Sequence, residues 1–316
     1  MILNGKADAM IRELAPSSGG EGGAKAKVNS KASADTGADT ERRIGPRTLD
    51  PRISIVIPAK NEARNLPEVF AMLPTENCEV ILVDGASTDD TVIEALRLRP
   101  DITVIGQTRK GKGNALACGF AAATGDFIVM IDADGSNDPA EIPRFVDALK
   151  EGADFAKGSR FLAGGGSHDI SLVRRFGNFW LNRIVNLLYG TRYTDLCYGY
   201  NAFRRESLAA MALDAGDSED FDDGTMRWGD GFEVETLINL RIAKAGLRVT
   251  EVPSLELVRH FGTSNLNAFS DGLRVLRTIH AEHNRGARQT SAEMARARRE
   301  TGTSWPLLST LDEDAS

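Results

Sequence analysis

Two aspartates separated by a single residue, Asp132 and Asp134, are the side chains in this sequence best placed to do chemistry. They follow the apolar run FIVMI at 127–131 and precede an Asp-Pro helix-start signal at 138–139. Two carboxylates at this spacing, at the end of a strand, can bind a nucleotide ribose and a hard divalent ion such as Mg²⁺ or Mn²⁺. An ordinary acidic loop is the alternative interpretation, and the flanking strand and helix signals favour the functional one.

The elements that must position these aspartates alternate between strand and helix. Apolar runs at 53–57, 79–83, 102–105 and 127–131 predict buried parallel strands. Segments with helical spacing follow them at 63–73, 89–98, 113–123 and 139–149. This alternation predicts an α/β fold with an open, mostly parallel sheet, in which ligands bind beyond the carboxyl ends of the strands.

The residues after the first two strands narrow the kind of site. PAKNEARNL at 58–66 contains neither GxGxxG nor a Walker A loop, which excludes the two commonest phosphate cradles. After the second strand, Asp84 could accept hydrogen bonds from a base or a ribose. It could equally be a turn aspartate that precedes the next helix, and the residues alone leave both open.

Composition excludes several classes of protein. The 316 residues carry 38 basic and 45 acidic side chains, a formal charge of −7 and a pI near 5.3, which argues against a nucleic-acid partner. Three cysteines without CxxC spacing indicate neither a disulfide framework nor a zinc site, and favour a reducing cytoplasm. No apolar run is long enough to span a bilayer, and the first residues lack the order of a secretory signal.

Segments of low apolar content at the two ends divide the chain into three parts. Residues 1–50 predict a disordered N-terminal arm, since they are rich in Ser, Gly, Ala and Lys. Residues 51–284 predict one catalytic domain, and residues 285–316 a polar C-terminal tail.

Several motifs in one order resemble a known family. They are IPAKNEARNL, VDGASTDDT, RKGKGNAL, IDADGSNDPAEIP, KGSRF, TDLCYGYNAFRR and GFEVE, spread over residues 52 to 270. This pattern resembles the inverting family 2 glycosyltransferases of the GT-A fold, closest to the dolichol-phosphate mannosyltransferase and polyprenyl-phosphate glycosyltransferase branch. The resemblance implies a single GT-A domain with a nucleotide-sugar-binding sheet flanked by helices, a nucleotide-sugar donor, and Mg²⁺ or Mn²⁺ as cofactor.

The resemblance also implies roles for individual residues. The base and ribose would meet Pro58, Ala59, Lys60, Glu62 and Asp84, and Lys112 would lie against the donor nucleotide. Asp132, Ala133 and Asp134 would contact the nucleotide sugar, with Asp132 and Asp134 as metal ligands. Arg160 would approach the acceptor phosphate or the departing diphosphate. Gly85 and Ser136 depart from the pattern of the branch, where Asp and Gln are common.

Three carboxylates could serve as a general base if the acceptor is an alcohol. Asp230, Glu233 and Glu235 lie in WGDGFEVETL at the start of a predicted helix. Asp230 is the nominated base and Glu235 matches the glutamate of the family. The alternative is that all three are carboxylates favoured by the helix dipole.

The segment 171–192 has apolar residues at helical spacing with arginines nearby. It predicts either an interfacial helix at a membrane or a helix packed on the core, and the sequence leaves both open. The resemblance favours Arg174 and Arg175 as partners of the acceptor phosphate. Among four histidines without a zinc motif, His260 is the one next to a family-like loop.

The leading hypothesis is a metal-dependent inverting glycosyltransferase in the cytoplasm, with a polyprenyl phosphate acceptor at the inner membrane face. One rival uses a soluble small-molecule acceptor, which the absence of a spanning segment favours. The other rival is a catalytically silent protein that binds sugar nucleotides.

Overall fold

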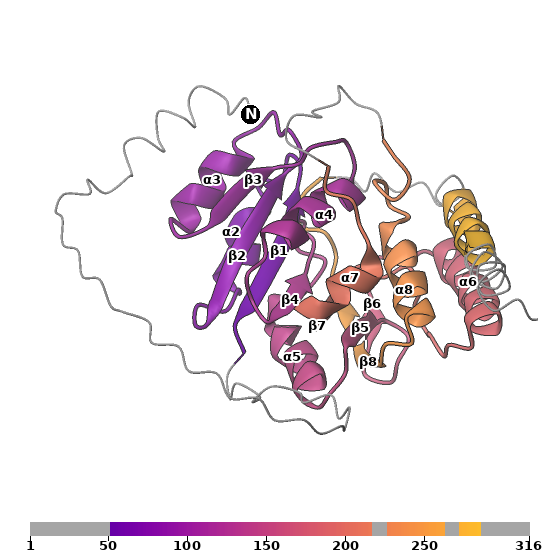
Figure 1. The fold of residues 1–316 in the computed structure, drawn as a ribbon. Helices are drawn as coiled ribbons and strands as arrows, with labels where there is room; N and C mark the ends of the chain where they lie inside the picture. Colours follow the sequence, from indigo (N-terminus) through magenta and orange to yellow (C-terminus); the bar gives the residue numbers. More distant parts are fainter. Residues whose placement is uncertain (1–50, 217–225, 263–271, 286–316) are drawn as a thin grey trace, which may run out of the picture.

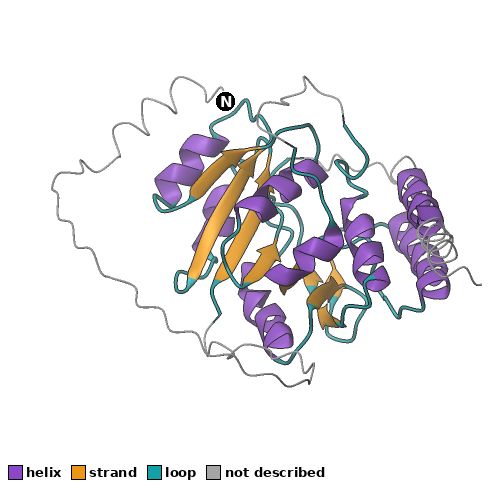
Figure 2. Ribbon diagram, viewed as in Figure 1, coloured by secondary structure: helices purple, strands orange, loops and turns teal. Residues whose placement is uncertain are grey.

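The computed structural model describes residues 51–216, 226–262 and 272–285. The predicted arm, residues 1–50, and all but the first residue of the predicted tail, 285–316, lie outside the described residues. A seven-stranded sheet forms the centre of the described part, with helices on both sides (Figures 1 and 2).

The sheet has the strand order β3-β2-β1-β4-β7-β5-β8. Its strands are β1 Ile53–Ala59, β2 Cys78–Asp84, β3 Thr103–Gly106, β4 Phe127–Met130, β5 Phe155–Ser159, β7 Asn201–Arg204 and β8 Val249–Pro253. All pairs are parallel except those of β7, which runs antiparallel to β4 and β5. A second, two-stranded sheet pairs β6 (Gly166–Ser167) with β9 (Leu255–Glu256). The predicted open, mostly parallel α/β sheet is confirmed.

The helices between the strands also agree with the predicted segments. They are α2 Leu66–Ala71, α3 Thr91–Leu98, α4 Lys112–Ala122 and α5 Ile142–Lys150, the last preceded by the short 3₁₀ turn η1 Pro139–Glu141. Later in the chain come α6 Leu172–Tyr189, η2 Arg205–Ser207, α7 Leu208–Met211 and α8 Val234–Lys244. Residues 272–285 are helical as well. The α2 helix is shorter than predicted, and Pro67 in its first turn is compatible with a start there.

Alternate residues of each strand pack on opposite faces, as the two-residue period of a strand requires. In β1, Ile55 and Ile57 join the core that contains α2, α3 and α5. Val56 joins the core that contains α4 and α8. Full burial of one such side chain stabilises the fold by about 1.5–3 kcal/mol. The strand ends are therefore held firmly.

The parallel register brings the carboxyl ends of four strands to one edge. Ala59 at the end of β1 pairs with Asp84 of β2, and Asp84 pairs with Gly106 of β3. On the other side of β1, Val56 pairs with Met130, so β4 ends at the same edge, just before Asp132. Chain segments that are far apart in the sequence thereby deliver their polar residues to one place.

A third cluster lies at the end of the molecule away from β3. There α6 packs beside the helix at 272–285 (Figure 1), and Val185 shares a small buried core with Leu240, Val275 and Ile279. Phe176, Phe179 and Trp180, for which the sequence left core packing open, are exposed instead. Among the described residues, no helix combines the length and apolarity needed to cross a membrane.

Candidate active site

A cavity of about 660 Å³ lies at the carboxyl edge of the sheet. The cavity extends from the carboxyl ends of strands β1, β2, β3 and β4 to the inner side of α6. The predicted site residues that line it are Pro58, Ala59, Lys60, Glu62, Lys112, Asp132, Ala133, Asp134, Arg160, Arg174 and Glu235. The structure thus gathers residues from six separate stretches of the chain around one space.

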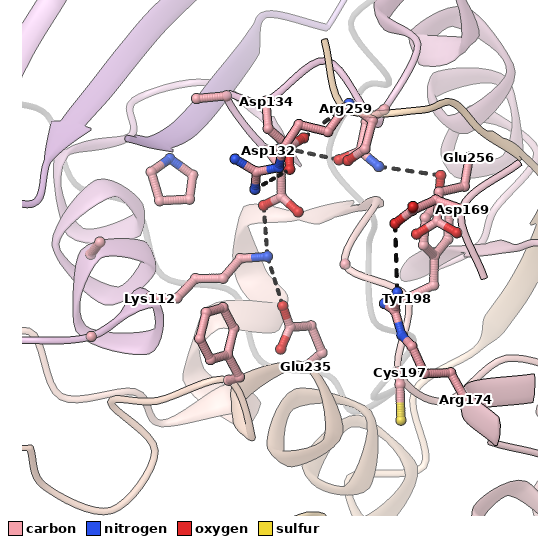
Figure 3. Close-up of a pocket in the computed structure, with 18 of the residues that line it drawn as sticks. Lys112, Asp132, Asp134, Asp169, Arg174, Cys197, Tyr198, Glu235, Glu256 and Arg259 are labelled. Carbon is pink, nitrogen blue, oxygen red and sulfur yellow. Dashed lines mark hydrogen bonds and ion pairs between the residues drawn. The ribbon is translucent and has the colours of Figure 1, made fainter. Parts of the chain in front are cut away.

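Lys112 joins two of the predicted carboxylates. Its Nζ lies 2.6 Å from Asp132 Oδ1 and 2.8 Å from Glu235 Oε1 (Figure 3). Burial alone would lower the pKa of Lys112, but the two carboxylates outweigh it and raise that pKa above its usual range. The ammonium therefore stays charged and holds the start of α8 against the end of β4.

Glycines on both sides of Lys112 allow this approach. The Gly113 N–H donates to the Asp230 carbonyl at 2.7 Å, and a Cβ on Gly113 would lie 1.8 Å from the Gly229 carbonyl oxygen. Gly111 has φ +119°, a conformation that favours glycine. The Gly-Lys-Gly turn therefore packs directly on residues 229–230, which places Lys112 within reach of Glu235.

Arg259 performs a similar task at the second aspartate. Its Nη2 lies 2.7 Å from Asp134 Oδ2, and its Nη1 lies 3.1 Å from Glu62 Oε1. Phe261 N–H donates to Asn65 Oδ1 at 2.9 Å, which ties this segment to the start of α2. Burial raises the pKa of Glu62, although Asn65 and Arg259 oppose that shift. The structure thus supplies a cavity arginine that sequence reasoning missed, although it directly precedes His260.

The buried carboxyl of Glu235 predicts a pH effect on stability. Burial raises its pKa, Lys112 opposes the shift and Asp132 adds to it. A carboxyl with a raised folded-state pKa stabilises the fold below its unfolded pKa of 4.5 and loses that contribution as the pH rises through the folded pKa. We therefore expect Glu235→Gln, which stays neutral, to gain in Tm relative to the wild type as the pH rises from 4.5 to about 7.

Thermal unfolding of both proteins across this pH range, in chelator, measures the effect. Tm curves that stay parallel would show that Glu235 has the same proton affinity in the folded and unfolded chain.

Arg160 lies at the floor of the cavity in a buried ion network. Its Nε and Nη2 donate to the two oxygens of Asp195 at 2.7 and 2.9 Å, and its Nη1 donates to Glu256 at 3.0 Å. The ring of Tyr198 stacks against the guanidinium, with 4.7 Å from Cζ to the ring centroid. Two carboxylates thus fix the Arg160 side chain, which is 4% exposed where it lines the cavity, and its contact with a phosphate stays a prediction.

The far end of the cavity is formed by α6 and its surroundings. Arg174 Nη1 lies 3.6 Å from Asp169, and Cys197 and Tyr198 line the same cavity (Figure 3). Apolar side chains of Ile170, Val173 and Leu181 line the same end. The Arg174 side chain is 27% exposed, and such a partly exposed cation beside apolar walls suits a ligand that combines an anionic group with a hydrocarbon portion.

Three predicted site residues do not line the cavity. The Asp84 carboxylate accepts from the Ser87 N–H at 3.2 Å, the geometry of a turn aspartate, while its neighbour Gly85 lines the cavity. Arg175 is exposed, 5.8 Å from the ring of Phe161.

Asp230 is also turned away from the cavity. Both of its oxygens accept from the buried guanidinium of Arg109 at 2.9 Å, and it also accepts from the Arg227 N–H. The nominated base is thus part of a buried pair that holds the 227–230 turn. Arg109 is a second residue that sequence reasoning missed, and its place just before the Gly-Lys-Gly turn was the available signal.

The sequence was compared with known protein families and proteins, and the matches identify a family. Residues 54–211 match the family described as "Glycosyl transferase family 2". The chain is 32% identical over 225 residues to the undecaprenyl-phosphate mannosyltransferase of Micrococcus luteus, covering 68% of this chain and 88% of that protein. It is 32% identical over 234 residues to the polyprenol monophosphomannose synthase of Mycolicibacterium smegmatis, covering 70% and 84%.

Solved structures show the same fold. The glucosyl-3-phosphoglycerate synthase of Mycobacterium tuberculosis, crystallised with Mn²⁺, UDP and phosphoglyceric acid, superposes with a TM-score of 0.56 at 23% identity. The match covers 74% of this chain and 78% of that one. The sheet, its helices and the cavity at the strand ends have the GT-A architecture, and the chain belongs to glycosyl transferase family 2.

Proposed function

We propose that this glycosyltransferase moves a sugar from a nucleoside-diphosphate sugar to a polyprenyl phosphate, with inversion and with a divalent metal ion. The observation that carries the proposal is the single cavity that joins Asp132 and Asp134 to the apolar, arginine-bearing end at α6. Relatives named for undecaprenyl phosphate and polyprenol phosphate support this choice of acceptor.

The side chains around the two aspartates fit a metal ion. Asp132 and Asp134 supply oxygen atoms, and in this structure each is paired with a cation, Lys112 and Arg259. Four carboxylates (Glu62, Asp132, Asp134 and Glu235) surround these two cations, which leaves a surplus of negative charge. In the described ranges, no three acidic, histidine or cysteine side chains form a metal cluster. Two carboxylates completed by substrate phosphates are a usual arrangement for Mg²⁺.

Asp132 and Asp134 would hold the ion, which when bound neutralises charge on the departing diphosphate. The acceptor phosphate is already an anion, so its oxygen needs orientation and no strong base. That oxygen bonds to the anomeric carbon while the bond from this carbon to the donor diphosphate breaks. Arg174 is placed to orient the acceptor phosphate, and Lys112 stays protonated beside the leaving group.

Product analysis with the purified full chain tests the acceptor. The enzyme and a nucleoside-diphosphate sugar are incubated with Mn²⁺ and one of two acceptors. The acceptor is either polyprenyl phosphate in detergent or 3-phosphoglycerate. We expect a lipid-soluble sugar phosphate. A water-soluble glycosylated product in its place would favour the rival with a soluble acceptor, and hydrolysis alone would contradict both.

Arg259 is expected to bind the donor diphosphate, because its guanidinium lines the cavity and can pair with two phosphate oxygens. A charge-assisted hydrogen bond contributes about 1.5–3 kcal/mol, so Arg259→Ala should raise the KM for the donor by about ten- to a hundredfold. Initial rates against donor concentration measure this. Arg259→Lys, which keeps the charge, should recover part of the loss, and an unchanged KM in the alanine variant would exclude the contact.

A further inference from the structure

Helix α6 is polar toward the protein and apolar toward solvent. On its inner side Asn178 donates to Asp195 Oδ1 at 3.1 Å, and Asn182 donates to the Thr194 carbonyl at 3.0 Å. One turn later, Asn186 donates to the Tyr193 carbonyl at 2.8 Å. These asparagines recur at four-residue spacing and therefore share one side of the helix. Specific hydrogen bonds thus contribute much of the attachment of α6 to the domain.

The opposite side carries large apolar groups in solvent, and we call it the outer face of α6. Its members and their exposed fractions are Leu172 (83%), Val173 (72%), Phe176 (65%), Phe179 (52%), Trp180 (52%), Leu187 (85%) and Leu188 (42%). Leu273 and Leu276 on the neighbouring helix, 44% and 41% exposed, add to the exposed apolar surface. A contiguous group of this kind marks an interaction surface, whereas single exposed apolar residues need no explanation.

The charge of α6 indicates the partner. The helix contains Arg174, Arg175 and Arg183 and no acidic residue, in a chain whose net charge is −7. The Arg183 guanidinium lies 5.5 Å from the ring centroid of Phe179, at the edge of the outer face. Aromatic and aliphatic groups bordered by arginines are typical of helices that lie in the headgroup region of anionic bilayers. A second copy docked through the same face would bring its arginines against these without acidic counterparts on α6.

The outer face also continues into the cavity. Val173, Arg174, Gly177 and Leu181 line the end of the cavity on the α6 side, and Val275 lines it from the helix at 272–285. A surface on which the outer face rests would therefore lie next to this end of the cavity.

We propose that the outer face of α6 docks on an anionic lipid bilayer and holds the acceptor end of the cavity against the headgroups. The purpose of this docking rests on the proposed function, since a polyprenyl phosphate reaches the enzyme from a membrane. The docking itself requires only lipid.

Vesicle sedimentation of the full chain tests the docking. The vesicles contain phosphatidylcholine with or without phosphatidylglycerol, and no polyprenyl phosphate. We compare the wild type with a Phe176→Ser, Trp180→Ser double variant, whose replaced side chains are exposed and do not line the cavity. Met72→Ser is the matched control, because Met72 is 41% exposed at the C-cap of α2.

We expect the wild type and the control to bind the anionic vesicles more strongly than the neutral ones. The partition coefficient of the double variant should fall by about tenfold or more, because two large apolar groups no longer insert. All three proteins share the same terminal segments, so a difference between them reports on α6. Binding that is absent in the wild type, or equal in the double variant, would overturn the proposal.

Two further measurements separate this proposal from the transferase activity and from self-association. The double variant should transfer sugar to a water-soluble short-chain prenyl phosphate at the wild-type rate and lose activity only toward polyprenyl phosphate in vesicles. Vesicle binding without transfer to any prenyl phosphate would leave the docking standing and contradict the proposed function. Transfer to polyprenyl phosphate in detergent without vesicle binding would support the proposed function and contradict the docking. Sedimentation equilibrium could also show a dimer of the wild type and a monomer of the double variant. That result would assign the outer face to a second copy and overturn the proposal of bilayer docking.

Discussion

Replacing Asp134 by alanine should lower kcat/KM by about a thousandfold, because a metal ion contributes several kcal/mol to the stabilisation of a departing diphosphate and each 1.4 kcal/mol is a factor of ten. The same change removes the carboxylate that lies 2.7 Å from Arg259. The protein should still fold, since Asp134 lies at the cavity wall and outside the core. Initial rates at saturating Mn²⁺, with circular dichroism to verify folding, measure the effect.

Asp138→Ala is the matched control for this experiment. Asp138 belongs to the same acidic loop, but its carboxylate accepts from the Ala140 N–H and caps η1 outside the cavity. Losing this cap should lower stability by about 1 kcal/mol and leave the rate near that of the wild type. Equal losses of activity in both variants would mean that the loop conformation, and not the Asp134 carboxylate, supports the reaction.

The second large effect is on stability. Asp195→Ala should lower the free energy of unfolding by about 3–5 kcal/mol, because it leaves buried donors of Arg160 and Asn178 without their acceptor, at a cost of about 1–3 kcal/mol each. The Arg160 and Asp195 side chains are 4% and 0% exposed, and Asn178 of α6 also donates to Asp195. The expected fall in Tm is about 2–4 °C for each kcal/mol in a domain of this size.

An exposed pair provides the comparison. Glu94 and Arg97 form a surface salt bridge on α3 at 2.6 Å, and surface pairs contribute little because water screens them. Glu94→Ala should therefore leave the Tm nearly unchanged. If Asp195→Ala has an equally small effect, the Arg160 network does not stabilise the domain.

The sequence predicted the fold well because its signals are local. Each predicted strand is a short apolar run such as FIVMI. The predicted burial is confirmed for most of β1, β2 and β4. It is wrong for β3, which lies at the edge of the sheet and has no buried residue. The position of Asp132 and Asp134 at a strand end follows from the same local pattern. The antiparallel β7 was not predicted, since a four-residue strand gives no local signal of its direction.

The parts of the site that depend on side-chain direction were harder to predict. Asp230 and Glu233 precede α8 and Glu235 lies in its first turn, so only the packed structure decides which carboxylate faces the cavity. Glu235 faces Lys112, whereas Asp230 faces Arg109. Arg259 lies 125 positions after its partner Asp134, and such a pairing has no local signature.

We expect Asp132 and Asp134 to bind a nucleotide sugar through a metal ion. Thermal unfolding of the wild type and of Asp134→Ala with UDP-, GDP- and dTDP-sugars, each with and without Mn²⁺, tests it most directly. A ligand at about a hundred times its Kd should add about 2.7 kcal/mol of stability. We predict that one nucleotide stabilises the wild type only when Mn²⁺ is present and leaves Asp134→Ala unchanged. Stabilisation that is the same without metal or in the variant, or no stabilisation by any nucleotide, would contradict the claim.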